Sequence, residues 1–202
     1  MDKEYLEHVK KQLEKKLNSH RYVHTLGVMY TAASLAMRYD CDVEAAMKAG
    51  LLHDCAKCIP NKEKISLCEK QGISISDVEL ANPGLLHAKL GAYLAESEYG
   101  IQDKEILHAI EVHTTGCPEM TLLDKIIYIA DFMEPYRDEA PNLSDVRALA
   151  FVDLDACLFR ILKDTMKYLQ SKKAPVDSMT ETTYDYYKQY MKTRKGEQLC
   201  KD

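Results

Sequence analysis

The chain has 202 residues, of which 46% are hydrophobic and 29% charged, and its formal net charge is -5. This length fits one domain, and the hydrophobic fraction is large enough for a sizeable buried core. The acidic balance argues against a general nucleic-acid binder, which usually carries a basic stripe or a high pI. An anionic small substrate is not excluded, because a metal ion and a few placed cations can outweigh the net charge locally.

The N-terminal segment and the cysteines indicate the compartment. Residues 1–5 are charged and lack the apolar core of a secretory signal. No window approaches the unbroken apolar length that a membrane span needs. The seven cysteines are odd in number and irregularly spaced, unlike a disulfide framework. We therefore expect a cytoplasmic chain that does not engage a membrane.

Hydrophobic residues recur with helical periodicity in the first part of the chain, and no convincing alternating strand is present. The pattern predicts helices over residues 3 to about 17, about 20 to 39, 42 to about 57, and 62 to 71. Asp42 is the expected N-cap of the third helix, and Pro60 lies just beyond its end. Gly72 is expected to end the fourth.

Asn82-Pro83-Gly84 is a strong turn signal that opens the second part. Helices are predicted over residues 85 to about 99, 103 to about 113, 121 to about 134, 153 to about 172, and 178 to about 194. Thr121 and Asp124 resemble a capping box, with Asp in place of Glu. We expect one compact all-α domain over residues 1–202, with a metal-binding core at about 20–137 and C-terminal helices at about 153–195.

Four ionisable side chains lie in helical segments that are otherwise apolar: His24, His53, Asp54 and Asp131. Burying an isolated carboxylate is expensive, so each buried Asp needs a cation or several hydrogen-bond donors. Any single His in such a helix has an ordinary structural explanation, since buried imidazoles are usually hydrogen-bonded. Together, two His and two Asp can share one divalent cation, and this mixed set suits Fe, Mn, Co, Ni or Zn better than Mg or Ca.

The order of these residues, and longer motifs around them, resemble one family. The motifs are RYVHTLGVM at 21–29, HDCAK at 53–57, NPGLLHA at 82–88, HTTG at 113–116 and MTLLDKIIYIAD at 120–131, followed by Glu134-Pro135 and Arg137. Together they resemble the bacterial symmetrical diadenosine tetraphosphate hydrolases of the HD-domain superfamily, over about residues 6–169. The resemblance implies a helical HD-domain fold and an iron-dependent hydrolase. Such an enzyme cleaves the central anhydride of a dinucleoside tetraphosphate and releases two nucleoside diphosphates.

The resemblance also implies a role for each matching residue. His24, His53, Asp54 and Asp131 match the shared metal ligands, for one ion or two. A metal held there lowers the pKa of a bound water and holds a phosphoryl oxygen, so no Ser or Cys nucleophile is needed. Asp54 is expected to act in catalysis as well, and His24 and Asp131 are expected to lie against the substrate.

His87 and His113 also lie in matching motifs, and two interpretations stay open for them. They are either ligands of a second metal that clamps the attacked phosphate, or phosphate donors or a general acid beside a single metal. In both cases we expect them to be catalytic residues that contact the substrate.

Three cations and one hydroxyl are the expected partners of the polyphosphate chain. Lys57 lies one turn after the His53-Asp54 pair, and Arg21 lies one turn before His24. Arg137 follows Asp131 across a Pro turn. Arg offers a bidentate phosphate contact and Lys a point charge, although a lone Lys or Arg is usually a solvated surface residue. Thr114 is expected to donate its hydroxyl or backbone amide, and Lys57 is also expected to act in catalysis.

Two alternative functions share the same ligand set. One is an HD phosphohydrolase that acts on another nucleotide, and the other is a non-catalytic nucleotide-sensing HD domain. In each case the expected partner is a small nucleotide, here diadenosine tetraphosphate with ADP as product, and the chain acts alone or as a homodimer. The remaining histidines, His8, His20 and His108, have no matching motif and are assigned to the surface or to packing.

Overall fold

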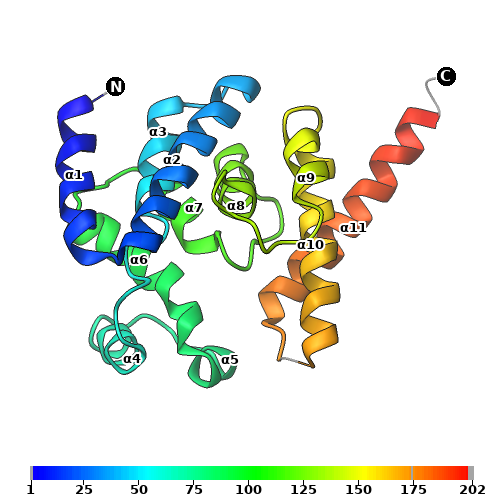
Figure 1. Ribbon diagram of the computed structural model, residues 1–202. Coiled ribbons are helices and arrows are strands. Elements are labelled where there is room, and N and C mark those ends of the chain that lie inside the picture. The colour runs from blue at the N-terminus through cyan, green and yellow to red at the C-terminus, as the bar shows by residue number, and fades with distance from the viewer. Residues whose placement is uncertain (1, 174, 200–202) are drawn as a thin grey trace.

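The computed structural model describes residues 2–173 and 175–199, with side chains described as far as residue 194. Over this part of the chain the structure consists of eleven α-helices and one 3-10 helix, without strands, which confirms the all-α expectation (Figure 1). The helices are α1 (Lys3–Lys16), α2 (Ser19–Tyr39), α3 (Val43–Leu52), α4 (Asn61–Lys70), α5 (Asp77–Ala81), η1 (Pro83–Leu86), α6 (His87–Ser97), α7 (Lys104–Val112), α8 (Leu122–Met133), α9 (Leu143–Ala150), α10 (Leu154–Lys172) and α11 (Ser178–Leu199).

Local capping explains where several helices begin. The Asp42 carboxylate accepts hydrogen bonds from the backbone amides of Glu44 and Ala45 at the start of α3. Thr121 and Asp124 form the reciprocal capping box predicted for α8. Each such cap satisfies amides that have no partner inside the helix. The predicted starts of α3 and α8 are therefore confirmed at the level of individual hydrogen bonds.

Other boundaries differ from the prediction. The third helix ends at Leu52 rather than near Lys57, and residues 53–59 form a series of tight turns. In a continued α-helix, the adjacent side chains of His53 and Asp54 would point about 100° apart. The turns instead bring both side chains towards one point.

Two short helices were not predicted, and the last helix is longer than predicted. The α9 helix begins after Asn142, which adopts a left-handed conformation with φ 58°, and it buries only Val146 and Ala150. So short a helix depends on its packing against α10 rather than on its own propensity. The equally short α5 begins at a Ser76–Glu79 capping box. The last helix continues to Leu199 rather than ending near Arg194.

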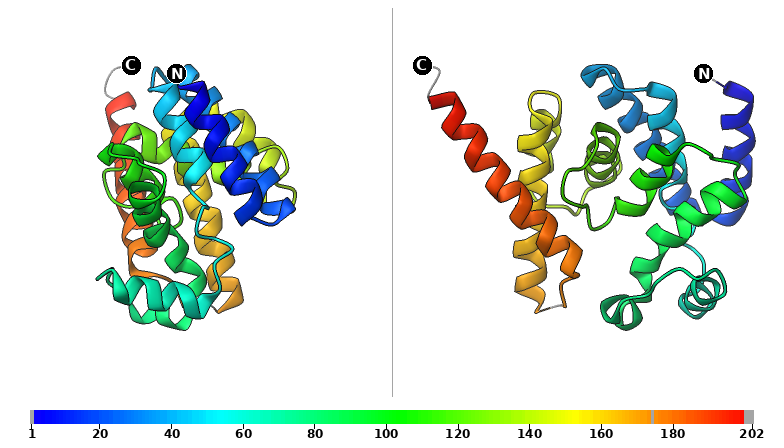
Figure 2. Two further views of the ribbon diagram at one scale, coloured as in Figure 1. Left: turned by 90° about the vertical axis from the view of Figure 1, so that its left-hand side faces the viewer. Right: turned by 180° about the vertical axis from the view of Figure 1, so that it is seen from behind.

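The α8 helix lies in the middle of the molecule. Figure 1 shows α1, α2 and α3 on one side of it and α9, α10 and α11 on the other. Figure 2 shows α4 and α5 together at one end of the molecule, below the main body. Burial agrees with this order, since Ile126, Ile127 and Ile129 of α8 are all 0% exposed. No helix within the described residues combines the length and the apolar character needed to cross a bilayer.

Helices α2 and α3 approach each other closely at Gly50. A Cβ atom at this position would lie 3.0 Å from the backbone Cα of Met29, which cannot move aside as a side-chain tip can. The absence of a side chain therefore lets α3 lie against α2. This contact brings the C-terminal end of α3, with His53, close to His24 on α2.

The tyrosines of α11 hold this helix against the rest of the fold. Tyr187 is 1% exposed, and its hydroxyl accepts a hydrogen bond of 3.1 Å from the backbone amide of Met120. The ring of Tyr184 stacks on Phe159 of α10 with 6.0 Å between ring centroids. The α11 helix is thus anchored by one buried hydroxyl and by aromatic packing.

We predict that Tyr187→Phe lowers the free energy of unfolding by about 1–3 kcal/mol, because the buried Met120 amide loses its acceptor. The matched control is Tyr190→Phe, whose hydroxyl makes an exposed contact with Asp155. That change should stay within about 0.5 kcal/mol. Urea unfolding followed by circular dichroism measures both. Equal effects of the two substitutions would contradict the anchoring role of Tyr187.

Candidate metal centre

Six polar side chains from separate helices meet beside α8. His24 comes from α2, the His53-Asp54 pair follows α3, His87 begins α6, His113 follows α7 and Asp131 lies near the end of α8. All but Asp131 are buried, and the Asp131 side chain is 22% exposed. The four predicted metal ligands and the two further predicted histidines are therefore brought together in one place.

The four predicted ligands surround a common point. The Nε2 atom of His24 lies 3.0 Å from Asp131 Oδ1 and 3.7 Å from Asp54 Oδ2. The Nε2 atom of His53 lies 3.5 Å from Asp54 Oδ2 and 3.7 Å from Asp131 Oδ1. Ligand atoms of His24, His53 and Asp131 all lie within 4.8 Å of one another. These distances allow one ion to contact all three.

Three buried polar atoms at this point make no hydrogen bond of acceptable geometry with the described residues, although oppositely charged or ring atoms lie near them. They are Nε2 of His24, Nε2 of His53 and Oδ1 of Asp54. Buried polar atoms are otherwise almost always paired, because leaving one unpaired costs free energy. A divalent cation would supply the missing partner to all three atoms at once. The residues therefore fit a metal ion, and their nitrogen and oxygen donors match a divalent transition metal.

Three of the histidines are held in place by the same backbone contact. In each, Nδ1 lies within hydrogen-bond distance of the carbonyl oxygen three residues earlier: 2.7 Å for His53 and Gly50, 2.6 Å for His87 and Gly84, and 2.7 Å for His113 and Ile110. Each histidine lies at the end of a helical segment, where carbonyl oxygens lack a partner inside the helix. With Nδ1–H donating to the carbonyl, the unprotonated Nε2 faces the centre, as a metal ligand requires.

His24 is oriented differently, by a buried carboxylate. Its Nδ1 lies 3.0 Å from Oε1 of Glu134, which is 1% exposed. Gly27 makes room for this carboxylate, because a Cβ there would collide with Oε2 of Glu134. We gave Glu134 no role from the sequence. The available signal was its position in the Glu134-Pro135 motif, directly after the end of α8 and three residues after Asp131.

Asp54 has the most contacts at the centre. Its Oδ2 accepts a hydrogen bond of 2.6 Å from Arg21, and its Oδ1 lies 3.1 Å from Nε2 of His87 and 3.7 Å from Nε2 of His113. Burial alone raises the pKa of Asp54, but the imidazoles of His53 and His113 outweigh burial and hold this pKa well below its ordinary value. Asp54 is therefore ionised and has contacts on two sides, one through each oxygen.

Asp131 and His87 are also in the protonation states that ligands need. Burial raises the pKa of Asp131, but His24 and His53 lower this pKa by more than burial raises it. The pKa of Asp131 therefore lies below its ordinary value. Burial lowers the pKa of His87 to about 4, with a further contribution from the neighbouring His113. At neutral pH the Asp131 carboxylate is charged and the His87 imidazole is neutral.

The three predicted cations all reach the centre, where they contact the ligand carboxylates. Arg21 binds Asp54, as described above, and Arg137 donates to Oδ1 of Asp131 over 2.8 Å. The Lys57 ammonium lies 3.1 Å from His87 Nε2 and 3.7 Å from Asp54 Oδ1. Their side chains are 22%, 36% and 33% exposed for Arg21, Arg137 and Lys57, so each also faces solvent.

The loop that carries Arg137 is held by a residue that we did not single out from the sequence. Arg147 on α9 donates hydrogen bonds of 2.9 Å and 2.8 Å to the carbonyl oxygens of Met133 and Glu134, and one of 2.8 Å to that of Arg137. The α9 helix thereby fixes the turn after α8. No local pattern marks Arg147, because its partners are backbone atoms.

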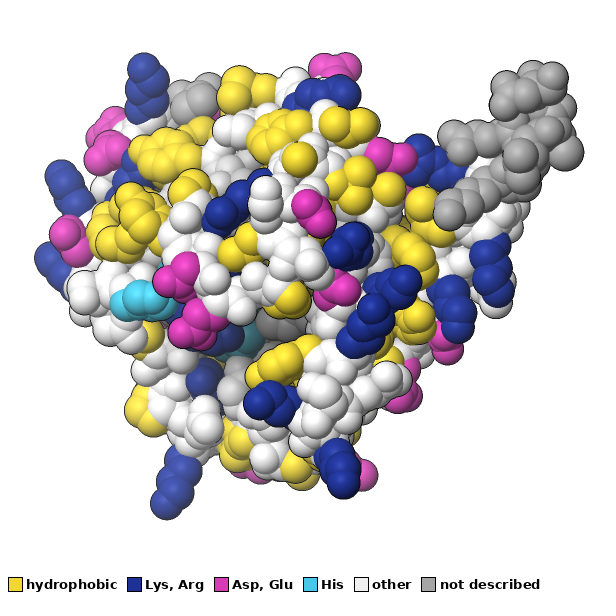
Figure 3. Space-filling model, turned by 45° about the vertical axis from the view of Figure 1, so that its right-hand side comes forward, with side chains coloured by type: hydrophobic (Ala, Val, Ile, Leu, Met, Phe, Trp, Pro, Cys, Tyr) yellow, Lys and Arg dark blue, Asp and Glu magenta, His cyan; other side chains and the backbone are white. Residues whose placement is uncertain are grey.

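A cavity of about 540 Å³ opens beside the centre. Its lining includes His113, Thr114, Asp131 and Arg137, together with aromatic side chains such as Tyr168. Figure 3 shows a hollow in the surface with a histidine side chain visible inside and both acidic and basic side chains at its rim. Thr114 therefore lies beside His113 in the lining of this cavity, whereas the exposed His8 and His20 lie on the surface.

Comparisons with known proteins agree with this arrangement. The HD-domain family model matches residues 21–135. The symmetrical bis(5'-nucleosyl)-tetraphosphatase of Bacillus subtilis is 45% identical, over 86% of this chain and 92% of its own length. The protein of the same name from Staphylococcus aureus is 35% identical, over 90% and 94%.

A solved structure has the same fold. The crystal structure of an HD superfamily hydrolase from Clostridium acetobutylicum, described as involved in NAD metabolism, superposes with a TM-score of 0.88. It is 39% identical in sequence, and the match covers 91% of this chain and 97% of the other. The helical fold, the centre formed by His24, the His53-Asp54 pair and Asp131, and these relatives all agree. The chain belongs to the HD-domain family and, within it, to the family of the symmetrical bis(5'-nucleosyl)-tetraphosphatases.

Proposed function

We propose that this protein is a metal-dependent hydrolase that cleaves diadenosine tetraphosphate symmetrically into two molecules of ADP. The observation that carries the proposal is the set of unpaired ligand atoms on His24, His53 and Asp54. A divalent cation explains such a set, because it would give all three buried atoms a partner at once. The choice of substrate rests on the relatives that cover most of this chain.

His24, His53, Asp54 and Asp131 would hold the metal, for which iron is our choice and Mn, Co, Ni or Zn are the alternatives. When bound, a divalent metal lowers the pKa of a water molecule and offsets negative charge on a phosphoryl oxygen. Glu134 keeps the His24 ring in the orientation that points Nε2 at the centre. Arg21 and Arg137 orient the two ligand carboxylates through hydrogen bonds.

For His87 and His113 we favour a role in which the unprotonated Nε2 atom donates its lone pair, either to a hydrogen bond or to a second metal ion. We favour this role over that of a general acid. A pKa of about 4 leaves the His87 imidazole neutral at neutral pH, and its one N–H donates from Nδ1 to the Gly84 carbonyl, so Nε2 has no proton to give to a leaving group. Ligand atoms of His53, Asp54 and His113 also lie within 4.8 Å of one another. Asp54 is placed between the two groups of histidines, with one oxygen towards each.

Arg21, Lys57 and Arg137 would bind the polyphosphate, with Thr114 donating from the edge of the cavity. Each cation is partly exposed and so can turn from a ligand carboxylate towards an anionic substrate.

We also infer a cytoplasmic location. A nucleotide substrate supports this inference, and so do the six described cysteines, which are all free thiols. The partner is a small nucleotide rather than a nucleic acid.

The protein loaded with ferrous iron should convert diadenosine tetraphosphate to ADP alone. In water enriched in oxygen-18, one of every two ADP molecules should carry the label on its β-phosphate, because a single water oxygen enters at the cleaved anhydride. Chromatography with mass spectrometry measures both outcomes. AMP with ATP would contradict symmetrical cleavage. A lack of turnover with every transition metal would favour the nucleotide sensor.

His53→Ala should reduce turnover to background and lower the metal content, because this ring supplies a buried ligand atom at the centre. The matched control is His20→Ala, an exposed histidine on α2. Metal analysis of both purified variants, with circular dichroism as a check of the fold, completes the comparison. Normal turnover of His53→Ala at full metal loading would refute its assignment as a ligand.

Glu134→Gln should weaken metal affinity or turnover by about 10–100-fold, because the amide orients the His24 ring less well than the carboxylate does. The exposed Glu69→Gln on α4 serves as the control. Competition with a fluorescent chelator reports the affinity independently of activity. If both variants bind metal as tightly as the parent protein and turn over equally fast, Glu134 does not position His24.

A further inference from the structure

A second group of metal-ligating side chains lies away from the centre, where α7 meets α8. His108 comes from α7, Cys117 from the loop between the two helices and Asp124 from the first turn of α8. One candidate ligand atom from each lies within 4.8 Å of the others. The Nδ1 atom of His108 is 3.0 Å from both carboxylate oxygens of Asp124.

The carboxylate of this group is fully buried. Asp124 is 0% exposed, and one of its oxygens accepts the capping hydrogen bond from the Thr121 amide. Among the described residues its ion-pair partner is His108, whose side chain is 45% exposed, and neither Lys nor Arg approaches it within ion-pair distance. Full burial of a carboxylate ordinarily requires stronger compensation than one exposed imidazole and one backbone amide.

Cys117 adds a sulfur atom to this carboxylate. Burial raises the pKa of the Cys117 thiol to about 11, and the negative charge of Asp124 adds to the increase. The thiol is therefore protonated when no cation is present. A divalent cation between the two groups would favour the thiolate and offset the charge of the buried carboxylate at the same time.

We propose that His108, Cys117 and Asp124 form a second cation site, which binds a thiophilic divalent ion of the Zn²⁺ class. Imidazole, thiolate and carboxylate are all ligands that Zn²⁺ accepts, and the thiolate disfavours Mg²⁺ and Ca²⁺. The site differs in chemistry from the main centre, whose donors are nitrogen and oxygen alone. Its three donors leave a fourth position for water or a further side chain.

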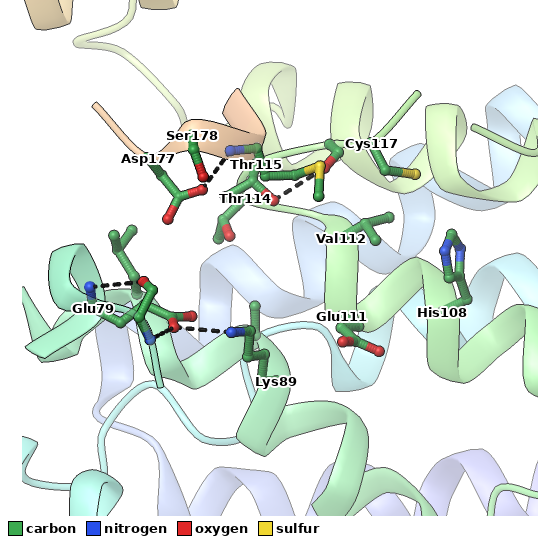
Figure 4. A pocket seen from close by; sticks show the side chains of 15 residues that line it. Glu79, Lys89, His108, Glu111, Val112, Thr114, Thr115, Cys117, Asp177 and Ser178 are labelled. Carbon is green, nitrogen blue, oxygen red and sulfur yellow. Dashed lines mark hydrogen bonds and ion pairs between the residues drawn. The ribbon is translucent and has the colours of Figure 1, made fainter. Parts of the chain in front are cut away.

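The proposed cation site has space beside it for a fourth ligand. His108 and Cys117 line a cavity of about 370 Å³, together with Glu111 one turn further along α7. Figure 4 shows His108 and Cys117 towards the same end of this cavity. A water molecule from this cavity can therefore complete a tetrahedral set.

A cation here would fasten the loop between α7 and α8. This loop begins at His113 and Thr114 and contains Gly116, which has φ 64° and lies against Thr183 of α11. A shared ion would join α7, the loop and α8 by three bonds. Its main effect would be on the stability of the loop rather than on the reaction.

Cobalt(II) provides a direct test, because a thiolate bound to cobalt gives a charge-transfer absorption that nitrogen and oxygen ligands do not. We expect this absorption to appear when the full-length protein, already loaded with iron, is titrated with Co²⁺, and to disappear on addition of Zn²⁺. It should be lost in Cys117→Ser and retained in Cys58→Ser, the control at an exposed cysteine. No absorption in the parent protein, or an absorption that survives in Cys117→Ser, would overturn the proposal.

A second variant guards against misfolding of Cys117→Ser. His108 is exposed, so His108→Ala should fold and keep the turnover of the parent protein. Zn²⁺ should raise the thermal unfolding midpoint of the iron-loaded parent protein and should not raise that of His108→Ala. An equal rise in both proteins would overturn the proposal as well.

Discussion

The constraint on which this structure depends is the clustering of four buried imidazoles, one buried carboxylate and one partly buried carboxylate at the central helix. A protein interior tolerates such groups only when each polar atom has a partner. Here the outer atoms have partners: Nδ1 of three histidines lies against a backbone carbonyl, Nδ1 of His24 lies against Glu134, and Asp54 accepts from Arg21. The inner atoms of His24, His53 and Asp54 lack them. Every contact around the centre thus turns a donor atom towards a position where a cation belongs.

Carbonyl oxygens at helix ends offset part of the cost of burying these imidazoles. His53, His87 and His113 each follow a short helical segment whose last carbonyl oxygens have no amide partner inside it. The ring satisfies one of these oxygens and is fixed by it, so a single hydrogen bond serves both the helix and the site. The close approach of α3 to α2 at Gly50, and the space left by Gly27 for Glu134, then bring separately fixed rings together. The fold and the centre are therefore products of the same contacts.

The sequence was sufficient for the longer helices and for the set of residues at the centre, but not for the short helices or for how these residues are held. Apolar periodicity and caps such as Thr121 with Asp124 predicted α8, and the order His24, His53-Asp54, Asp131 predicted which groups meet. The turns after Leu52 and the short α9 helix could not be predicted, because tertiary packing rather than local propensity maintains them. Arg147 was missed because backbone carbonyls leave no trace in a residue pattern, and Glu134 because its partner lies 110 positions away in the chain.

The most direct test of the central claim is anomalous diffraction from crystals of the protein grown with iron, recorded on both sides of the iron absorption edge. The account predicts an anomalous peak within about 2.0–2.3 Å of Nε2 of His24, Nε2 of His53 and an oxygen from each of Asp54 and Asp131, the usual range for metal bonds to nitrogen and oxygen. A peak elsewhere in the molecule, with these four side chains bonded to one another and no ion between them, would contradict it.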